Sequence, residues 1–365
     1  MARAGDSFSP PFCPNPDCVF HRDSKGWRFR KKGFFVRRAT PRRIQRYRCL
    51  HCHRNFSSQT FHVTYWLKRP DLLAPLLLRS LACSGYRQIA REFSVSPSAI
   101  QHQIERLGRH CLLFHELHRP KGPPTEPLVI DGFESFEFSQ YSPGHFHLAV
   151  GRGSHFFYGF GDSELRRKGR MNDAQKRRRA ELEAIFGRPD PQSIEKEMAA
   201  LLEWVVPPGT PVEIHSDEHP AYPRAFRRLS DRPVVHRTTS SKEPRTSHNP
   251  LFPVNLLDLL IRHGSANHKR ETIAFSKQRG CAAYRLAILL VWRNYMKPFS
   301  ERRRDATPAQ RLDLVGRLLG VAEVLGRRLF PSRIRLPERW ARYYWRRVRT
   351  RRLPDAPEHC RVFAV

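Results

Sequence analysis

The sequence is short of acidic side chains. It has 365 residues, with 34 aspartates and glutamates against 66 lysines and arginines, and its formal net charge is +32. Uncompensated positive charge on this scale repels itself unless a polyanion neutralises it, and nucleic-acid phosphates are the usual polyanion. The charge therefore predicts a protein that binds nucleic acid.

Long apolar runs are missing too. No stretch has the length of a transmembrane helix, and the sequence carries neither a signal peptide nor a lipidation motif. These absences disfavour a basic membrane-surface protein, and we expect a location inside the cell. There is also no Walker loop, no Gly-x-Ser-x-Gly elbow and no His-Glu-x-x-His pair, so three common kinds of catalytic site are not indicated.

The pattern of the chain changes several times and predicts a modular organisation. A linker at 121–127, rich in proline, separates helical periodicity from strand-like segments. We expect a disordered N-terminus at 1–12, a zinc ribbon at 13–60, a helix-turn-helix domain at 70–118, an α/β domain at 126–298 with a charged helical insertion near 162–187, and a basic helical tail at 299–365.

Within the α/β domain, strands and helices follow in a mixed order. Runs rich in Val, Ile, Phe and Tyr predict strands at 128–138, 145–151, 154–161, 211–216 and 233–239. Apolar residues at helical spacing predict helices at 193–206, 221–229, 254–268 and 282–296.

Two close pairs of cysteines predict a metal site near the N-terminus. The pairs are Cys13 with Cys18, and Cys49 with Cys52. Four thiolates complete the tetrahedral shell of a structural Zn²⁺ and leave no position open for chemistry. Because the first pair is spaced more widely than usual, His21 remains an alternative to Cys18.

Residues 84–107 fit a helix-turn-helix. Ser96 is a suitable N-cap with Pro97 at the first helical position, and Ile100 and Ile104 anchor the second helix. An ordinary helical hairpin is the alternative, which the net charge disfavours. In a DNA-binding helix the outward side chains would contact bases or phosphates, and the candidates are Ser98, Gln101, His102, Gln103 and Arg106.

Two carboxylates end apolar strands of the α/β domain. Asp131 follows Val129 and Ile130, and Asp217 lies 86 residues later at the end of another strand. If those strands are neighbours in an RNase H-like sheet, both carboxylates meet at one end of it. Two divalent ions held there would support in-line phosphoryl transfer.

A third ligand is expected on the helix that follows. Asn255, Asp258 and Arg262 share one face of it, opposite a run of leucines. Asn255 or Asp258 offers an oxygen to magnesium, and Arg262 is suited to a phosphate. Glu271 is a more distant alternative.

The order of these motifs resembles bacterial insertion-sequence transposases of the DDE type. The resemblance covers about residues 13–298 and rests on 47–56 in the ribbon, the helix-turn-helix, Ile130-Asp131, 215–222, 270–277 and 292–295. The sequence is similar in particular to a subgroup of these transposases with asparagine at the third acidic position, since Asn255 stands 38 residues after Asp217.

The resemblance implies an α/β fold with an RNase H-like mixed sheet, Asp131 and Asp217 as ligands of Mg²⁺ or Mn²⁺, and a bacterial cytoplasmic, nucleoid-associated protein. It further implies binding to terminal inverted repeats and target DNA as a homo-oligomer, with hydrolysis exposing 3′-hydroxyls that attack the target. Two alternatives remain: a domesticated, catalytically silent DNA-binding regulator, and a nuclease that does not transpose.

Overall fold

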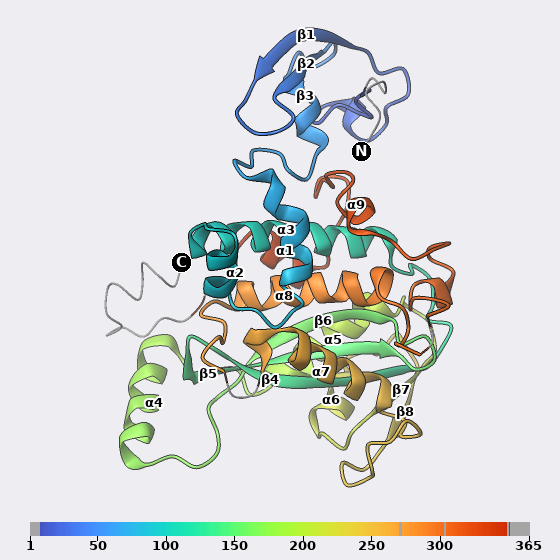
Figure 1. The fold of residues 1–365 in the computed structure, drawn as a ribbon. Coiled ribbons are helices and arrows are strands. Elements are labelled where there is room, and N and C mark those ends of the chain that lie inside the picture. The colour runs from blue at the N-terminus through green and yellow to red at the C-terminus, as the bar shows by residue number, and fades with distance from the viewer. Residues whose placement is uncertain (1–7, 270–271, 303, 349, 351–365) are drawn as a thin grey trace.

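The N-terminal part of the chain forms a small antiparallel sheet. The structure is a computed structural model that describes residues 8–269, 272–302, 304–348 and 350. The sheet has the order β1-β2-β3 and lies at the top of the molecule in Figure 1. Its strands are β1 (Phe29–Val36), β2 (Arg43–Cys49) and β3 (Asn55–Ser57), accompanied by 3₁₀ turns at Val19–His21 and Ser58–Phe61.

Residues 8–12 pack against this sheet, although we expected the whole of 1–12 to be disordered. The Tyr47 hydroxyl donates a hydrogen bond to the Phe8 carbonyl at 3.0 Å. Phe12 meets Phe61 edge to face, with ring centroids 5.3 Å apart. Aromatic burial therefore orders this segment. Residues 1–7 lie outside the described residues.

Three helices follow the small sheet, after a 3₁₀ turn at Pro70–Leu72. They are α1 (Leu73–Arg79), α2 (Tyr86–Glu92) and α3 (Pro97–His118). The Ser96 hydroxyl accepts a hydrogen bond from the Ala99 amide at 3.2 Å, which is the N-cap that the sequence predicts for α3. Ile89, Ile100 and Ile104 are buried between the helices.

The larger part of the chain is mixed α/β, built around a five-stranded sheet of order β6-β5-β4-β7-β8. β5 runs antiparallel to both of its neighbours, β4 and β6. β7 runs parallel to both of its neighbours, β4 and β8. The strands are β4 (Leu128–Glu137), β5 (Ser139–Gly151), β6 (Phe157–Glu164), β7 (Val212–Ser216) and β8 (Val234–Thr238).

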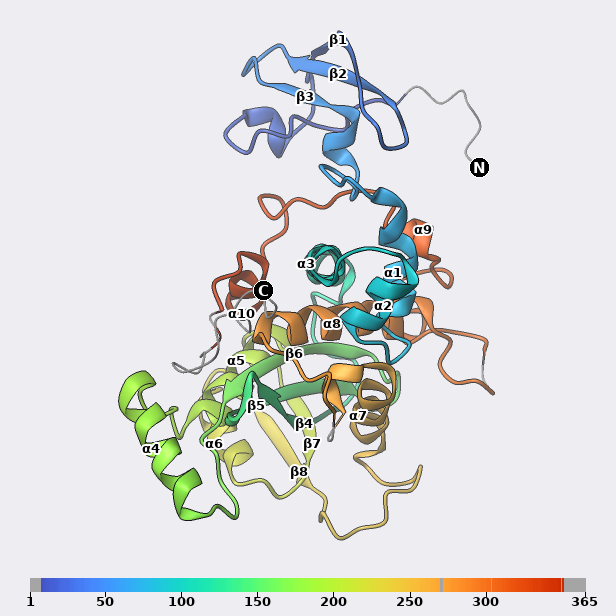
Figure 2. The same cartoon turned by 60° about the vertical axis from the view of Figure 1, so that its left-hand side comes forward.

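Helices flank the sheet (Figures 1 and 2). α5 packs on β5 and β6, α7 packs on β4 and β5, and α3 lies along α8. The bounds are α4 (Asp173–Phe186), α5 (Ser193–Val205), α6 (Ala221–Arg227), α7 (Phe252–Gly264), with a 3₁₀ turn at Ala266–His268, and α8 (Arg279–Val291), which continues as a π-helical turn at Trp292–Met296. No helix in the described part of the chain is long and apolar enough to cross a membrane.

The charged insertion is shorter than we expected, because β6 continues through its first residues. Asp162 is 1% exposed. Its carboxylate contacts Arg279 at 3.3 Å and Arg339 at 3.4 Å, and the Tyr343 hydroxyl donates a hydrogen bond to it. A buried carboxylate needs such partners. Only α4 corresponds to the helix that we expected in this insertion.

The C-terminal part is not the helical tail that the sequence suggests. Among its described residues, regular helix is limited to a 3₁₀ turn at Gln310–Leu312, α9 (Val321–Val324) and α10 (Glu338–Tyr344). Trp340 and Tyr343 are buried against the rest of the protein. The aromatic residues between the arginines of this segment therefore belong to the core, and prolines and glycines interrupt the helices around them.

The same segment returns to the small N-terminal sheet. Phe330 packs against Phe12 and Phe61, with ring centroids 5.2 and 5.8 Å apart. The Arg328 amide donates a hydrogen bond to the Phe61 carbonyl at 2.7 Å, and the Arg333 guanidinium donates one to the His21 carbonyl, also at 2.7 Å. Residues 328–333 thus complete the core of the N-terminal unit.

The helical layer contains a histidine that is buried in its neutral form. His115 on α3 is 0% exposed, with Nε2 2.9 Å from the Tyr158 carbonyl and Nδ1 3.2 Å from the Tyr295 hydroxyl. The carbonyl requires a proton on Nε2, so Nδ1 accepts from the tyrosine. Burial lowers the pKa of His115 to about 3, although the hydrogen bond to the Tyr158 carbonyl opposes the shift.

We predict that His115 makes the fold sensitive to acid. Its pKa is lower in the folded than in the unfolded chain, so its stabilising contribution is complete above about pH 6.5 and declines as the pH falls from there towards 3. Urea unfolding of His115→Gln at pH 7.5 and pH 5 tests this. The variant should be less stable than the wild type at pH 7.5, and the difference should shrink at pH 5. A difference that does not depend on pH would contradict the prediction.

Candidate metal and nucleic-acid sites

The four predicted cysteines meet at one point of the N-terminal unit. Their sulfur atoms all lie within 4.8 Å of one another, and the sulfurs of Cys13 and Cys52 are 3.6 Å apart. Zinc–sulfur bonds of about 2.3 Å in a tetrahedron place the sulfurs about 3.8 Å apart. The cluster is compatible with zinc binding. Among the described residues, it is the only group of three or more Cys, His, Asp or Glu ligands that is this close.

The surroundings favour a thiolate at Cys49. The Trp27 indole N–H donates a hydrogen bond to its sulfur at 3.3 Å. Burial opposes ionisation, but this bond and those from the backbone amides of Cys52 and His51 lower the pKa of Cys49 to about 7. Burial raises the pKa of Cys13 and of Cys18 in the same cluster, so a bound cation would be needed to hold all four sulfurs as thiolates.

His21 does not replace Cys18. Its Nδ1 lies 2.8 Å from the Cys13 carbonyl and its Nε2 2.7 Å from the Ser332 hydroxyl. Both ring nitrogens are therefore engaged in hydrogen bonds, whereas Cys18 belongs to the sulfur cluster.

The candidate DNA-binding residues of α3 fall into two groups. Ser98 and His102 are exposed near the start of the helix. Gln103 is buried, and its amide donates a hydrogen bond to the Arg69 carbonyl at 2.8 Å. We therefore withdraw Gln103 as a base-contacting residue. It points inward because the same face of α3 carries Ile100, Ile104 and Leu107 into the core.

The two remaining candidates of this helix make contacts within the protein. The Gln101 amide lies 3.4 Å from the Gln278 side-chain oxygen. Arg106 donates a hydrogen bond to the Val63 carbonyl at 2.9 Å and is half-buried. Ser98 and His102 are thus the two candidates on α3 that are fully exposed.

The parallel pairing of β4 with β7 determines where the two aspartates lie. Leu128 pairs with Ile214, and Val129 with His215. Asp131 lies two residues beyond this pair on β4, and Asp217 lies just past the end of β7 at Ser216. The two carboxylates are near enough for the charge of Asp217 to raise the pKa of Asp131. We expected Asp131 to end its strand, but antiparallel pairing with β5 extends β4 to Glu137.

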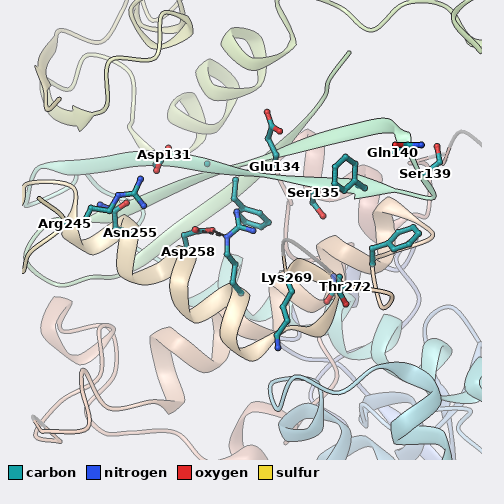
Figure 3. A pocket seen from close by; sticks show the side chains of 16 residues that line it. Asp131, Glu134, Ser135, Ser139, Gln140, Arg245, Asn255, Asp258, Lys269 and Thr272 are labelled. Atoms are coloured by element: carbon teal, nitrogen blue, oxygen red, sulfur yellow. Dashed lines mark hydrogen bonds and ion pairs between the residues drawn. The ribbon is translucent and has the colours of Figure 1, made fainter. Parts of the chain in front are cut away.

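A cavity of about 520 Å³ opens between β4 and α7. Asp131 lines it from the strand, and Asn255, Asp258 and Arg262 line it from the helix. Figure 3 shows Asn255 and Asp258 on the side of the helix that faces the strand, with Arg245 beside Asn255. Asp217 is not among the residues that line this cavity.

Asp131 lies in an environment that disfavours its charge. Burial, together with the nearby carboxylates of Asp217 and Asp258, raises its pKa to about 6, while the Gly132 amide and Arg245 act in the opposite direction. Carboxylates that lie close to one another are the arrangement that hard divalent cations neutralise.

The two candidates for a third ligand differ in their partners. The Asp258 carboxylate holds the Arg262 guanidinium, with oxygens 2.9 and 3.1 Å from Nε. Arg262 also donates a hydrogen bond to the His268 carbonyl at 3.3 Å. The Asn255 side chain faces the cavity without a hydrogen bond to any described residue. Glu271 lies outside the described residues.

Two residues at this site received no role from the sequence. Arg245 reaches the cavity from the basic loop between β8 and α7. Tyr222, on α6, is buried. Burial is the main reason why its pKa is raised well above the usual range, and the nearby carboxylates of Asp131 and Asp217 add to the shift. Tyr222 lies within a conspicuous stretch, 215–222, but a buried tyrosine is ordinarily a core residue. Nothing in the sequence indicates which residue of the basic loop turns inward.

Comparisons with known proteins add little. No family model matches the chain, and no curated protein matches it. A solved structure that resembles it is described as "CryoEM structure of simian T-cell lymphotropic virus intasome in complex with PP2A regulatory subunit B56 gamma". The TM-score is 0.26 with 15% sequence identity, over 67% of this chain and 74% of the other. A likeness at this TM-score carries no information about fold or chemistry.

For the cysteine cluster we predict a structural metal whose loss unfolds the N-terminal unit. Cys49→Ser should reduce the zinc content of the purified protein from about one ion per chain to a small fraction, because three ligands cannot fill a tetrahedral shell. Cys83→Ser is the matched control, since Cys83 lies outside the cluster. Elemental analysis of both variants is the measurement. Full zinc content in Cys49→Ser would exclude the site.

Proposed function

We propose that this protein is a transposase that cuts and joins DNA with the help of divalent metal ions. The observation that carries the proposal is the pairing of β4 with β7, which brings the Asp217 carboxylate near that of Asp131, while Asp131 also lines the cavity that contains Asn255 and Asp258. The strand order, three antiparallel strands joined to two parallel ones through β4, is that expected of an RNase H-like sheet.

In the proposed reaction the carboxylates of Asp131 and Asp217 and the side-chain oxygen of Asn255 would hold the cations. Two bound divalent ions would activate the attacking oxygen and stabilise the leaving oxygen of an in-line phosphoryl displacement. Arg245 and Arg262 lie at the same cavity and are suited to hold the phosphate that reacts. Water attacks first and frees a 3′-hydroxyl at the end of the element, and this hydroxyl then attacks target DNA.

Recognition of the DNA is assigned to the N-terminal unit and to the exposed start of α3. Ser98 and His102 are accessible there, and the net charge of +32 suits a phosphate backbone. Strand cleavage and transfer at paired ends requires more than one active site, so we propose that a homo-oligomer assembles on the DNA.

The first experiment is end cleavage. Purified protein is mixed with a duplex that carries the DNA flanking the coding region, in Mg²⁺ or Mn²⁺, with Asp131→Ala alongside. We expect cutting that yields 3′-hydroxyl ends by the wild type alone. Binding without cutting in either metal would favour the second candidate function, a catalytically silent DNA-binding regulator. The observation that favours this candidate is that position 255 holds an asparagine where a third acidic ligand is usual.

A second experiment separates Asn255 from Asp258. We predict that Asn255→Ala lowers the cleavage rate roughly 100-fold and raises the Mg²⁺ concentration needed for half-maximal cutting, because it removes a ligand, whereas Asn255→Asp retains cutting. Asp258→Asn should lower the rate roughly 10-fold through misplacement of Arg262, with the Mg²⁺ dependence unchanged. Single-turnover rates over a Mg²⁺ titration measure both. The reverse pattern would make Asp258 the ligand.

A further inference from the structure

We propose that the β1–β2 hairpin is a DNA-binding ribbon that enters the major groove of duplex DNA. This inference rests on the proposed function, which takes DNA as the substrate and assigns its recognition in part to the N-terminal unit. It assigns a contact surface that is separate from α3 and from the cavity between β4 and α7.

The charge of the hairpin and its flanks is of one sign. Residues 24–70 contain fourteen lysines and arginines and no aspartate or glutamate. The exposed basic side chains of the hairpin itself include Arg30, Lys31, Lys32, Arg38, Arg42 and Arg43. The hairpin itself, residues 29–49, contains no acidic side chain. Such a cluster fits a polyanion, because each phosphate contact releases a condensed counterion.

One arginine of the hairpin, Arg37, holds the turn together and is not available to contact DNA. Arg37 donates hydrogen bonds to the carbonyls of Pro41 and Thr40, at 2.9 and 2.8 Å, and to the Gln59 side chain at 3.1 Å. It therefore holds the turn in shape. Arg38 and Arg42, next to these residues, are exposed at the tip.

The hairpin also exposes large apolar side chains. Phe34, Phe35 and Val36 are 48%, 38% and 77% exposed. The guanidinium of Arg43 lies 3.8 Å from the centroid of the Phe34 ring. Aromatic and aliphatic surface between cations suits base edges and thymine methyl groups within a groove that is lined by phosphates.

The shape of the hairpin agrees with this partner. β3 pairs with Arg46, Tyr47 and Arg48 only, so the outer half of the hairpin is a two-stranded ribbon. Eight residues of β1 extend over roughly 26 Å. The major groove of B-DNA is about 12 Å wide and admits such a ribbon. Figures 1 and 2 place the hairpin at the end of the molecule furthest from the five-stranded sheet.

A second copy of this chain is a poorer partner for the free edge of β1. The register of β1 against β2 shifts between Lys31 and Phe34, where Gly33 has a φ of 68° and its carbonyl accepts a hydrogen bond from Gln45 at 2.8 Å. A bulge and two adjacent lysines interrupt the edge and block the addition of a further strand. Electrostatic complementarity therefore favours DNA.

The test is binding of a mixed-sequence duplex of about 30 base pairs, without Mg²⁺ so that no cutting occurs, over a series of salt concentrations. The variant is Lys31→Ala/Lys32→Ala. The matched control is Arg22→Ala/Lys25→Ala, which removes the same charge from exposed positions of the N-terminal unit outside the hairpin. Zinc content checks that both variants are folded.

We expect the hairpin variant to bind on the order of tenfold or more weakly at 0.1 M salt, with the slope of log K against log salt reduced by about 1.8, and the control to change much less. Phe34→Ala/Phe35→Ala should weaken binding with the salt slope unchanged. Equal loss in the hairpin variant and the control would overturn the proposal, as would a loss confined to a single-stranded oligonucleotide of the same sequence.

A cleavage assay separates the proposed role of the hairpin in DNA binding from the proposed function of cutting DNA. Since the hairpin lies far from the cavity, Lys31→Ala/Lys32→Ala should retain the wild-type cleavage rate at saturating protein and lose it only at low concentration. If no variant and no wild-type protein cuts DNA, the proposed function fails while the binding result still decides the role of the hairpin.

Discussion

The parallel pairing of β4 with β7 is the constraint on which the proposed active site depends. Parallel strands cannot be joined by a tight turn, so β5, β6, α4 and α5 all intervene between Asp131 and Asp217. Only the pairing brings the two side chains near each other. β4 is central: β5 extends it on one side, and β7 contributes the second carboxylate on the other.

Burial of charge recurs in this protein with two different outcomes. Around Asp162 every buried charge has partners of opposite sign, including Arg279 and Arg339, and the result is a fixed junction between the sheet and the C-terminal segment. Around Asp131 the carboxylates of Asp217 and Asp258 lie close, and Arg245 compensates them only in part, since Arg262 is paired with Asp258. The first arrangement is suited to stability, and the second to holding an exchangeable cation.

The sequence predicts the elements of the fold well where local signals are strong. The N-cap Ser96, the strand of Val129 and Ile130, and the four clustered cysteines lie as their patterns indicate. It fails where distant contacts decide. Gln103 lies on the face of α3 that packs into the core, where its amide donates a hydrogen bond to a carbonyl 34 residues away, and Asp162 is held in β6 by arginines far along the chain. Arg245 enters the cavity from an irregular loop, for which sequence periodicity offers no guide.

The contact between Phe330 and the N-terminal unit has a consequence for biosynthesis. The rings of Phe12 and Phe61 contact each other within the N-terminal segment, but Phe330 joins them only when residues 328–333 have been made. During most of translation the cysteine-bearing segment therefore lacks this part of its core. We expect a chain that ends before Phe330 to leave that apolar side exposed and to associate with other chains more readily than the full-length protein.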